Sequence, residues 1–206
     1  GFVGDDGPTH HGLFDYSYLR SIPNIVVMAP KDENELQHML KTAILCKGPA
    51  SIRYPRGEGT GVLLDETPES IEIGKAEIVR TGGDVAIIAI GSTVYPSIAA
   101  AQILAGKGIE ATVVNSRFVK PLDTALLCDI ASSHKKMIIV EENVLMGGFG
   151  SAVLELFSEK GISGITVKRL GIRDEFVEHA TQAQLRRMHG IDADGIAQAV
   201  QHIMGE

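Results

Sequence analysis

The densest group of residues able to do chemistry lies near the start of the chain, in the run Gly4-Asp5-Asp6-Gly7-Pro8-Thr9-His10-His11-Gly12. Its glycines and proline favour a tight loop that presents Asp6 and His10 together. A histidine that titrates near neutral pH can move a proton, and a nearby carboxylate can set its charge and tautomer. The alternative is a solvated turn. A metal site of these aspartates and histidines would match no standard ligand spacing, so no metal is expected here.

A second group, Arg53-Tyr54-Pro55-Arg56-Gly57, follows a predicted strand at residues 51–54. Pro55 holds the residue before it extended, Arg53 is expected to point from a face of the sheet, and Arg56 lies where the chain leaves it. A guanidinium there can hold a phosphate or a carboxylate through two hydrogen bonds, and the alternative is a surface salt bridge. With parallel strands, both groups would lie at one edge of the sheet, where open α/β sheets bind ligands.

A third group, Gly147-Gly148-Phe149-Gly150, stands between a predicted strand and a predicted helix and resembles a phosphate-cradling turn. Val153 stands where the dinucleotide fingerprint has a small residue, and no acidic ribose partner follows about 20 residues on. Tight packing of the helix on the strand is therefore the favoured interpretation. Residues 174–179 are expected to form a charged, partly solvated face.

Composition excludes several classes of protein. The 206 residues are 44% hydrophobic and 22% charged with a net charge of −7, which is typical of a globular protein. A nucleic-acid groove needs a basic stripe, and a membrane span needs about 20 apolar residues, so neither nucleic acid nor membrane is expected as a partner. Cys46 and Cys128 cannot form a disulfide framework, which favours a reducing, intracellular compartment.

The elements that must position these groups follow from hydrophobic periodicity and capping residues. Before residue 57 the pattern predicts strands at 25–29 and 51–54, helices at 13–19 and from Asp32 to about residue 47, and the remnant of a strand at Phe2-Val3. After residue 74 it predicts strands at 75–80, 85–90, 111–115, 137–141 and 165–168, with helices at 93–106, after Asp123, from about Ser151 and after Thr181.

Strands that alternate with helices indicate an α/β fold with a mostly parallel sheet covered on both faces. The glycine-rich, acidic segment between the two halves is the expected linker. The first half has too few strands to cover both faces of a parallel sheet, so we expect the chain to begin in the middle of a domain.

The motifs together resemble 1-deoxy-D-xylulose-5-phosphate synthases, which belong to the thiamine-diphosphate-dependent, transketolase-like enzymes. The resemblance is carried by residues 4–12, by Ser17-Tyr18-Leu19-Arg20-Ser21-Ile22-Pro23-Asn24, by Arg53-Tyr54-Pro55-Arg56-Gly57, and by the segment 170–182. The element Gly-Pro-Thr-His alone also occurs in dehydrogenase E1 β subunits, and its combination with Arg-Tyr-Pro-Arg-Gly is more specific. Arg173 and Ala180 depart from the family, which commonly has proline and glycine there.

The resemblance implies an architecture and a reaction. Residues 1–60 would be the back half of a pyrimidine-binding domain, 61–74 a linker, and 75–206 a transketolase C-terminal-type domain. The substrates would be pyruvate and D-glyceraldehyde 3-phosphate, and the product 1-deoxy-D-xylulose 5-phosphate, an isoprenoid precursor. By motif position, His10 would assist proton transfer at the reacting carbons, Asp6 would orient the acceptor or the imidazole, and Arg56 would hold the acceptor's phosphate.

The cofactors implied are thiamine diphosphate and Mg²⁺, but the residues that hold them would precede Gly1, so no cofactor-binding residue is expected in this chain. We therefore expect the chain alone neither to bind the cofactor tightly nor to turn over. Its expected partners are the missing N-terminal part and a second copy in a homodimer, in a bacterial-type cytoplasm or, alternatively, a plastid. The competing interpretations are a β subunit or C-terminal half of another transketolase or α-ketoacid dehydrogenase-type enzyme, and a non-catalytic dimerisation module.

Overall fold

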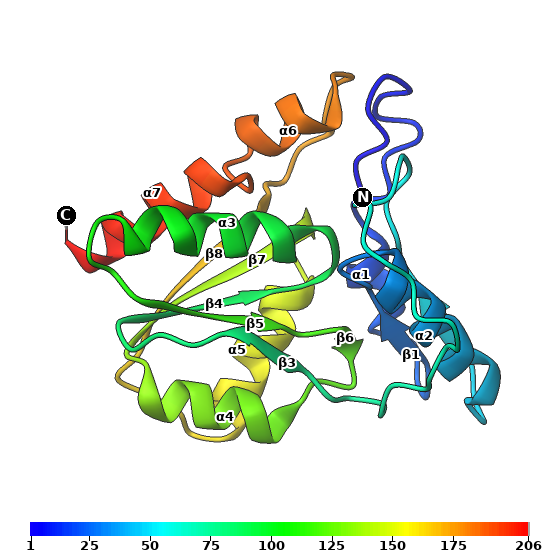
Figure 1. Ribbon diagram of the computed structural model, residues 1–206, viewed down its shortest axis with the longest axis horizontal. Helices are drawn as coiled ribbons and strands as arrows, with labels where there is room; N and C mark the ends of the chain where they lie inside the picture. The colour runs from blue at the N-terminus through cyan, green and yellow to red at the C-terminus, as the bar shows by residue number, and fades with distance from the viewer. Residues whose placement is uncertain (206) are drawn as a thin grey trace.

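The computed structural model describes residues 1–205, which form a larger and a smaller unit side by side (Figure 1). The larger unit is built on a five-stranded sheet in the order β3-β5-β4-β7-β8. Its strands are β3 (Glu77–Arg80), β4 (Val85–Ala89), β5 (Ala111–Asn115), β7 (Lys136–Val144) and β8 (Thr166–Ile172). The four strands β5, β4, β7 and β8 are parallel, and only the edge strand β3 is antiparallel.

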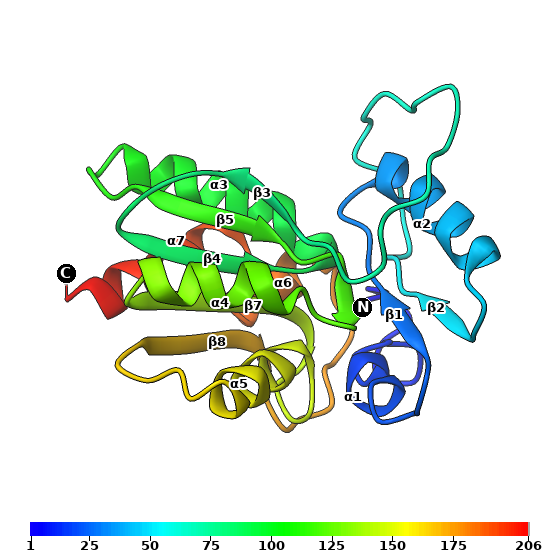
Figure 2. The ribbon, with the colours of Figure 1, turned by 90° about the horizontal axis from the view of Figure 1, so that it is seen from below.

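Helices cover both faces of this sheet (Figures 1 and 2). They are α3 (Val94–Ala105) and α7 (Ala193–Met204) on one face, and α4 (Thr124–Ser133) and α5 (Phe149–Glu159) on the other. Successive side chains of β4 point alternately to the two faces of the sheet, because a strand has a period of two residues. Val85 and Ile87 join the cluster under α3 and α7, whereas Ala86 and Ile88 join the cluster under α4 and α5. The predicted α/β fold with a mostly parallel sheet is confirmed.

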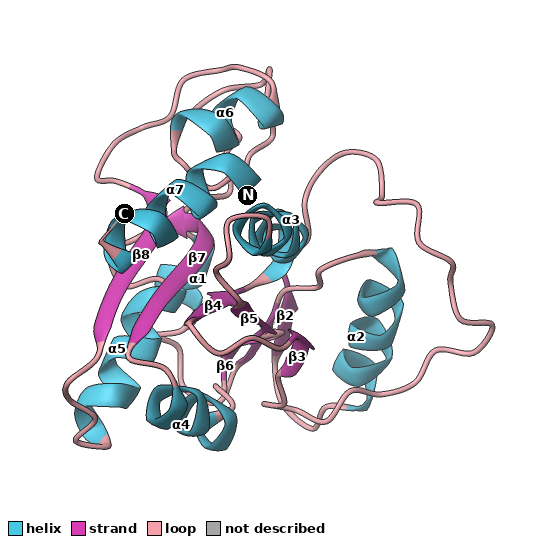
Figure 3. Ribbon diagram, turned by 60° about the vertical axis from the view of Figure 1, so that its left-hand side comes forward, coloured by secondary structure: helices cyan, strands magenta, loops and turns pink. Residues whose placement is uncertain are grey.

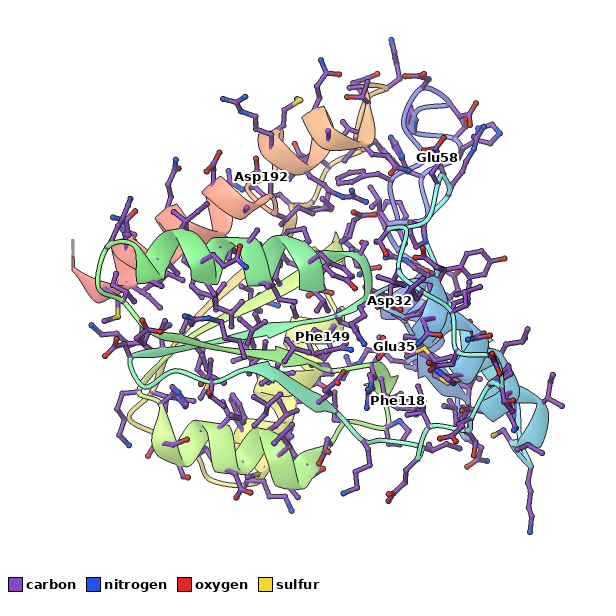
Figure 4. All side chains as sticks on the ribbon, viewed as in Figure 1. Asp32, Glu35, Glu58, Phe118, Phe149 and Asp192 are labelled. Carbon is purple, nitrogen blue, oxygen red and sulfur yellow. The ribbon has the colours of Figure 1, made fainter. Side chains whose placement is uncertain are left out.

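Side-chain caps start three of the predicted helices where the sequence places them. Asp32 accepts a hydrogen bond from Glu35 N at 2.7 Å to begin α2 (Glu33–Leu45), and Asp123 accepts one from Leu126 N at 3.1 Å to begin α4. Thr181 and Gln184 form a reciprocal capping box at the start of α6 (Gln182–Met188). The helix α7, which was not predicted, begins with a one-way side-chain cap: Asp192, labelled in Figure 4, accepts a hydrogen bond from Gly195 N at 2.9 Å.

The smaller unit contains α1 (Asp15–Leu19), β1 (Val26–Met28), α2 and β2 (Ala50–Ile52). As predicted, β1 and β2 are parallel. The third strand of their sheet is β6 (Phe118–Lys120), which belongs in sequence to the larger unit and pairs antiparallel with β1. This strand was not predicted. The small sheet is therefore built from both sides of the expected linker.

The two units meet at a junction that has both polar and apolar buried contacts. Glu35 on α2 is 3% exposed and accepts hydrogen bonds from Arg117 Nε at 2.7 Å and from Asn115 Nδ2 at 2.9 Å. Beside it, Phe118 is buried with Met28 and Met39 between β1 and α2. Figure 4 labels Glu35 and Phe118 where α2 meets the larger unit. The buried contacts across this junction fix the two units relative to each other.

The expected linker runs over α2 without helix or strand (Figure 3). Side chains of α2 hold it there: Glu33 accepts hydrogen bonds from the backbone of residues 60–62, and Thr42 Oγ1 accepts one from Ile71 N at 2.7 Å. Within residues 1–205, no helix has the length and apolarity needed to cross a membrane.

The prediction of a strand at Phe2-Val3 is wrong. Phe2 N donates to Glu142 Oε1 at 2.9 Å, and Val3 N donates to His11 Nδ1 at 3.1 Å. The carbonyl of Phe2 accepts a hydrogen bond from Gln182 Nε2 at 2.9 Å. Side chains, not a neighbouring strand, thus satisfy the backbone groups of this segment, which is why the short apolar pair needs no sheet.

Candidate functional site

Residues 4–12 form a tight loop, as predicted. Gly4 and Gly7 have φ angles of +84° and +70°, a region that favours glycine. The amide of Gly7 donates to Gly4 O at 3.1 Å, and the amides of His10 and His11 both donate to Gly7 O, at 3.0 and 3.2 Å. Two successive turns therefore fold the loop onto itself and keep Asp6 and His10 at the same end of the molecule.

The two histidines of the loop differ in environment. His11 is 8% exposed, and because its Nδ1 accepts from Val3 N, its Nε2 carries the proton and donates to Glu178 O at 3.4 Å. Both ring nitrogens of His11 are thus used by the backbone. His10 is exposed, and its Nδ1 lies 3.0 Å from Thr9 Oγ1. Of the two rings, only that of His10 is exposed to solvent.

Asp6 and Arg56, two residues singled out from the sequence, meet in an ion pair between Asp6 Oδ2 and Arg56 Nη1. Their side chains are 38% and 63% exposed, so both remain accessible. They line an open hollow of about 300 Å³, here called the Asp6–Arg56 hollow. Its lining residues are Val3, Gly4, Asp5, Asp6, Arg56, Gly57, Thr181 and Gln182.

His10 lies in the same loop as Asp6 but does not line this hollow. Within residues 1–205 its ring makes no hydrogen bond to Asp6 or Arg56; its partner is Thr9. The structure therefore brings the carboxylate to the guanidinium and leaves the imidazole on the adjoining part of the loop. Asp6 was expected to orient either the acceptor or the imidazole; its contact among the described residues is instead with Arg56, no hydrogen bond joins it to His10, and both roles stay predictions.

Arg53, the other arginine of the second group, is buried rather than open to a ligand. Its Nε donates to Asp15 Oδ2 at 3.1 Å, and its Nη2 donates to Gly12 O at 3.1 Å and to Glu142 O. The guanidinium also lies 4.3 Å from the centroid of the Tyr16 ring, a cation–π contact. Arg53 thus fastens the end of the loop to the larger unit, while Arg56 faces the hollow.

Sequence reasoning missed three consecutive buried polar residues, Glu141, Glu142 and Asn143, at the carboxyl end of β7. Glu142 is fully buried and accepts hydrogen bonds from Phe2 N at 2.9 Å and Arg186 Nε at 2.7 Å. Burial alone would raise the pKa of Glu142, but Arg186 and Arg53 outweigh it and hold that pKa below its usual value. The sequence signal that could have found them is the pair Glu141-Glu142 directly after an apolar strand, because it lies at the carboxyl edge of the parallel sheet, where ligands and interfaces occur.

Glu141 explains the glycine-rich turn. Its carboxylate accepts hydrogen bonds from Phe149 N at 2.7 Å and Gly150 N at 2.8 Å, at the start of α5. Burial raises the pKa of Glu141 to about 7, although these two donors act in the opposite direction. The chain's own carboxylate thus occupies the place where a phosphate would bind, and a Cβ on Gly148 would lie 2.3 Å from it. The packing interpretation of this turn is confirmed.

The fold and these two loops define a class of protein. The chain belongs to the transketolase family: residues 74–196 match the transketolase C-terminal domain, and residues 1–60 match the transketolase pyrimidine-binding domain. Among solved structures, one described as a split gene transketolase, inactive beta4 tetramer, is similar with a TM-score of 0.85 and 32% identity. That similarity covers 95% of this chain and 63% of the other.

Curated relatives narrow the likeness to one kind of enzyme. The chain is 65% identical over 204 residues to the 1-deoxy-D-xylulose-5-phosphate synthase of Syntrophus aciditrophicus (strain SB), covering 99% of this chain and 31% of that synthase. It is 59% identical over 204 residues to 1-deoxy-D-xylulose-5-phosphate synthase 1 of Geobacter metallireducens, covering 99% of this chain and 33% of the relative. The chain thus spans about a third of these relatives, and the resemblance drawn from the motifs is confirmed.

The described residues show neither a metal site nor an open diphosphate cradle in the glycine-rich turn. Residues 1–205 contain no group of three or more His, Cys, Asp or Glu side chains that could hold a metal ion. The glycine-rich turn that could cradle a diphosphate is filled by Glu141.

Proposed function

We propose that this chain forms the acceptor-binding part of a 1-deoxy-D-xylulose-5-phosphate synthase. In that enzyme, the two-carbon unit left after pyruvate loses CO₂ would be joined to D-glyceraldehyde 3-phosphate. Thiamine diphosphate with Mg²⁺ would supply the carbanion chemistry, and residues outside this chain would hold both. Identity of 65% to a synthase, against 32% to a split gene transketolase, supports this reading over other family members.

Arg56 would bind the phosphate of the aldehyde. Its side chain is exposed, and its ion pair with Asp6 is made through Nη1. A guanidinium has five N–H donors in a planar fork, so the remaining donors suit two oxygens of a phosphate. Asp6 would hold the guanidinium at the hollow while the substrate is absent. The ion pair that joins the two predicted groups is the observation that carries this proposal.

His10 would move a proton at the reacting carbons. Its Nδ1 is next to the hydroxyl of Thr9, whereas Nε2 has no hydrogen-bond partner within residues 1–205. A ring fixed on one side and free on the other can give or take a proton at the free nitrogen. Its position beside the Asp6–Arg56 hollow supports action on a substrate whose phosphate is held by Arg56.

The test uses a chimera in which this chain replaces the matched segment of the Syntrophus aciditrophicus synthase. It should form 1-deoxy-D-xylulose 5-phosphate from pyruvate and D-glyceraldehyde 3-phosphate. Arg56→Ala should then raise KM for the aldehyde far more than KM for pyruvate. Arg80→Ala is the matched control, because Arg80 forms a surface pair with Glu110 away from the hollow. Equal rises in both KM values would remove Arg56 from its role.

We further propose that the chain alone neither binds thiamine diphosphate tightly nor turns over, and that it works as part of a homodimer. The similar solved structure is an inactive beta4 tetramer, and its inactivity supports the proposal that the chain alone does not turn over. Its assembly from copies of one chain supports self-association. Incubation of the 206-residue chain with cofactor, Mg²⁺ and both substrates tests the first point, and sustained CO₂ release would contradict it. Two free cysteines support a reducing site of action such as the bacterial cytoplasm.

The alternative with an observation in its favour is a β subunit of a split transketolase-type enzyme, because the similar solved structure is one. The two candidates differ in the donor. A synthase takes its two-carbon unit from pyruvate with loss of CO₂, whereas a transketolase takes it from a ketose phosphate without loss of CO₂. Supplying each donor to the chimera separates them, and turnover of the ketose phosphate alone would favour the alternative.

A further inference from the structure

A short segment of the larger unit, residues 178–182, lies along the loop of residues 4–12 (Figure 1). His11 donates to Glu178 O at 3.4 Å. A Cβ on Gly7 would lie 3.3 Å from His179 Cβ, and one on Gly4 would lie 3.4 Å from Ala180 O. The loop therefore contacts this segment at the two glycines where its backbone turns. Residues 174–179 are mostly exposed as expected, but the end of this stretch also supports the loop.

Gln182, at the end of this segment, joins two backbones that sequence places far apart. Its Nε2 donates to Phe2 O at 2.9 Å and to Arg56 O at 2.7 Å. A side-chain amide nitrogen has two hydrogens, and both are used here. Because carbonyl oxygens only accept, the nitrogen and not the oxygen of the amide must face them. Gln182 thus ties the start of the loop to the residue that carries the guanidinium.

The place of Gln182 is itself fixed by the larger unit. It is the first residue of α6, whose start is held by the reciprocal bonds of Thr181 and Gln184. Three residues on, Leu185 is 1% exposed in the core, and Arg186 donates to the buried Glu142. Since Glu142 also accepts from Phe2 N, both backbone groups of Phe2 are held by the larger unit.

We propose that Gln182 is a positioning residue for the acceptor site. It sets the backbone positions from which the side chains of Asp6 and Arg56 meet, and so controls how well the hollow binds the phosphate of the aldehyde. The inference rests on the proposed function. It assigns a role in substrate binding to the larger unit, through a side chain at the edge of the hollow whose two donor hydrogens are taken by backbone carbonyls.

The test is Gln182→Glu in the chimera, because glutamate has the same shape but its carboxylate cannot donate to two carbonyls. KM for D-glyceraldehyde 3-phosphate should rise about tenfold, as expected for two lost hydrogen bonds, while KM for pyruvate stays within about twofold. With unphosphorylated D-glyceraldehyde as acceptor, the variant should match the wild type within about twofold. A merely structural defect would affect both aldehydes alike.

Gln184→Glu is the matched control. The same substitution two residues on should have no effect, because Gln184 Oε1 accepts from Thr181 N at 3.1 Å and from Thr181 Oγ1 at 2.9 Å, and a carboxylate accepts equally well. Gln182→Met has a side chain of similar length without hydrogen-bond donors, and it separates the loss of the two hydrogen bonds from the effect of the added negative charge. Unchanged kinetics in both Gln182 variants, or equal changes in both KM values, would overturn the proposal.

A second measurement separates this inference from the proposed function. Amide hydrogen exchange on the 206-residue chain should be faster at residues 1–7 and 54–58 in Gln182→Glu than in the wild type or in Gln184→Glu. If the wild-type chimera makes no product, the proposed function fails, and the exchange result alone decides the positioning role. Faster exchange at both segments would support that role, and unchanged exchange would refute it.

Discussion

Removing the charge of Glu142 should unfold the chain at lower temperature, by an amount that follows from its contacts. Glu142 is fully buried and accepts one charge-assisted hydrogen bond from Arg186 and one hydrogen bond from Phe2 N. In Glu142→Gln the amide oxygen can still accept from Phe2 N, but the amide nitrogen then faces Arg186 Nε and cannot accept, so the bond to Arg186 is lost. A hydrogen bond to a charged group contributes about 1.5–3 kcal/mol, so the loss should be of that size.

Glu142→Ala should cost more, about 3–5 kcal/mol, because it leaves the guanidinium of Arg186 and the buried Phe2 amide without the carboxylate to which they donate. For a chain of this size, each kcal/mol shifts Tm by about 2–4 °C. The midpoint should therefore fall by about 3–12 °C in Glu142→Gln and by more in Glu142→Ala. Circular dichroism during heating measures these midpoints, and urea unfolding measures the free energies.

The matched control is Glu155→Gln, which also weakens a glutamate–arginine pair. Glu155 pairs with Arg20, but its side chain is 58% exposed, so the effect should stay below about 1 kcal/mol. The pKa of Glu142 is held below its usual 4.5, so its stabilisation should be present above pH 4.5 and disappear as pH falls through the lower folded-state value. A loss in Glu142→Gln no greater than in Glu155→Gln would refute the reasoning.

Three further outcomes are expected. Burial raises the pKa of Glu141 from 4.5 to about 7, so between these pH values the folded chain binds a proton that the unfolded chain has lost. The free energy of unfolding should therefore fall as pH rises from 4.5 to 7. Urea titrations at several pH values should show a smaller fall in Glu141→Gln. Gly148→Ala should cost about 1–3 kcal/mol, since the new methyl would overlap Glu141, whereas Gly83→Ala, with open space around it, should change stability little. Residues 75–206 alone should fold but expose Phe118, because its cluster partners lie on β1 and α2. Binding of a hydrophobic dye, or self-association in sedimentation, should reveal the added apolar surface.

The fold was largely accessible from sequence because its signals are local. The run Val85–Ala89 is apolar throughout, as a strand buried on both faces requires, and Asp32, Asp123 and Thr181 each mark a helix start. The strand β6 was missed because it is only three residues long and is stabilised by its partner β1, about ninety positions earlier in the chain.

The site was accessible in part. The pairing of Asp6 with Arg56 follows from two loops that leave the same side of the fold, and both had been singled out by residue type. The support behind them was not visible, because Glu142 and Gln182 act through contacts more than a hundred residues away in sequence. Local patterns show which side chains can react, but long-range contacts decide which of them are held in place.

The strand β6 has a consequence for synthesis on the ribosome. Until Phe118–Lys120 has emerged, one side of β1 has no partner from this sheet, and the apolar side chains of Met28 and Met39 lack Phe118 as a neighbour. The first sixty residues are therefore made well before the strand that completes their sheet. The nascent chain must protect this open edge while roughly sixty more residues are added, at about 5–20 residues per second.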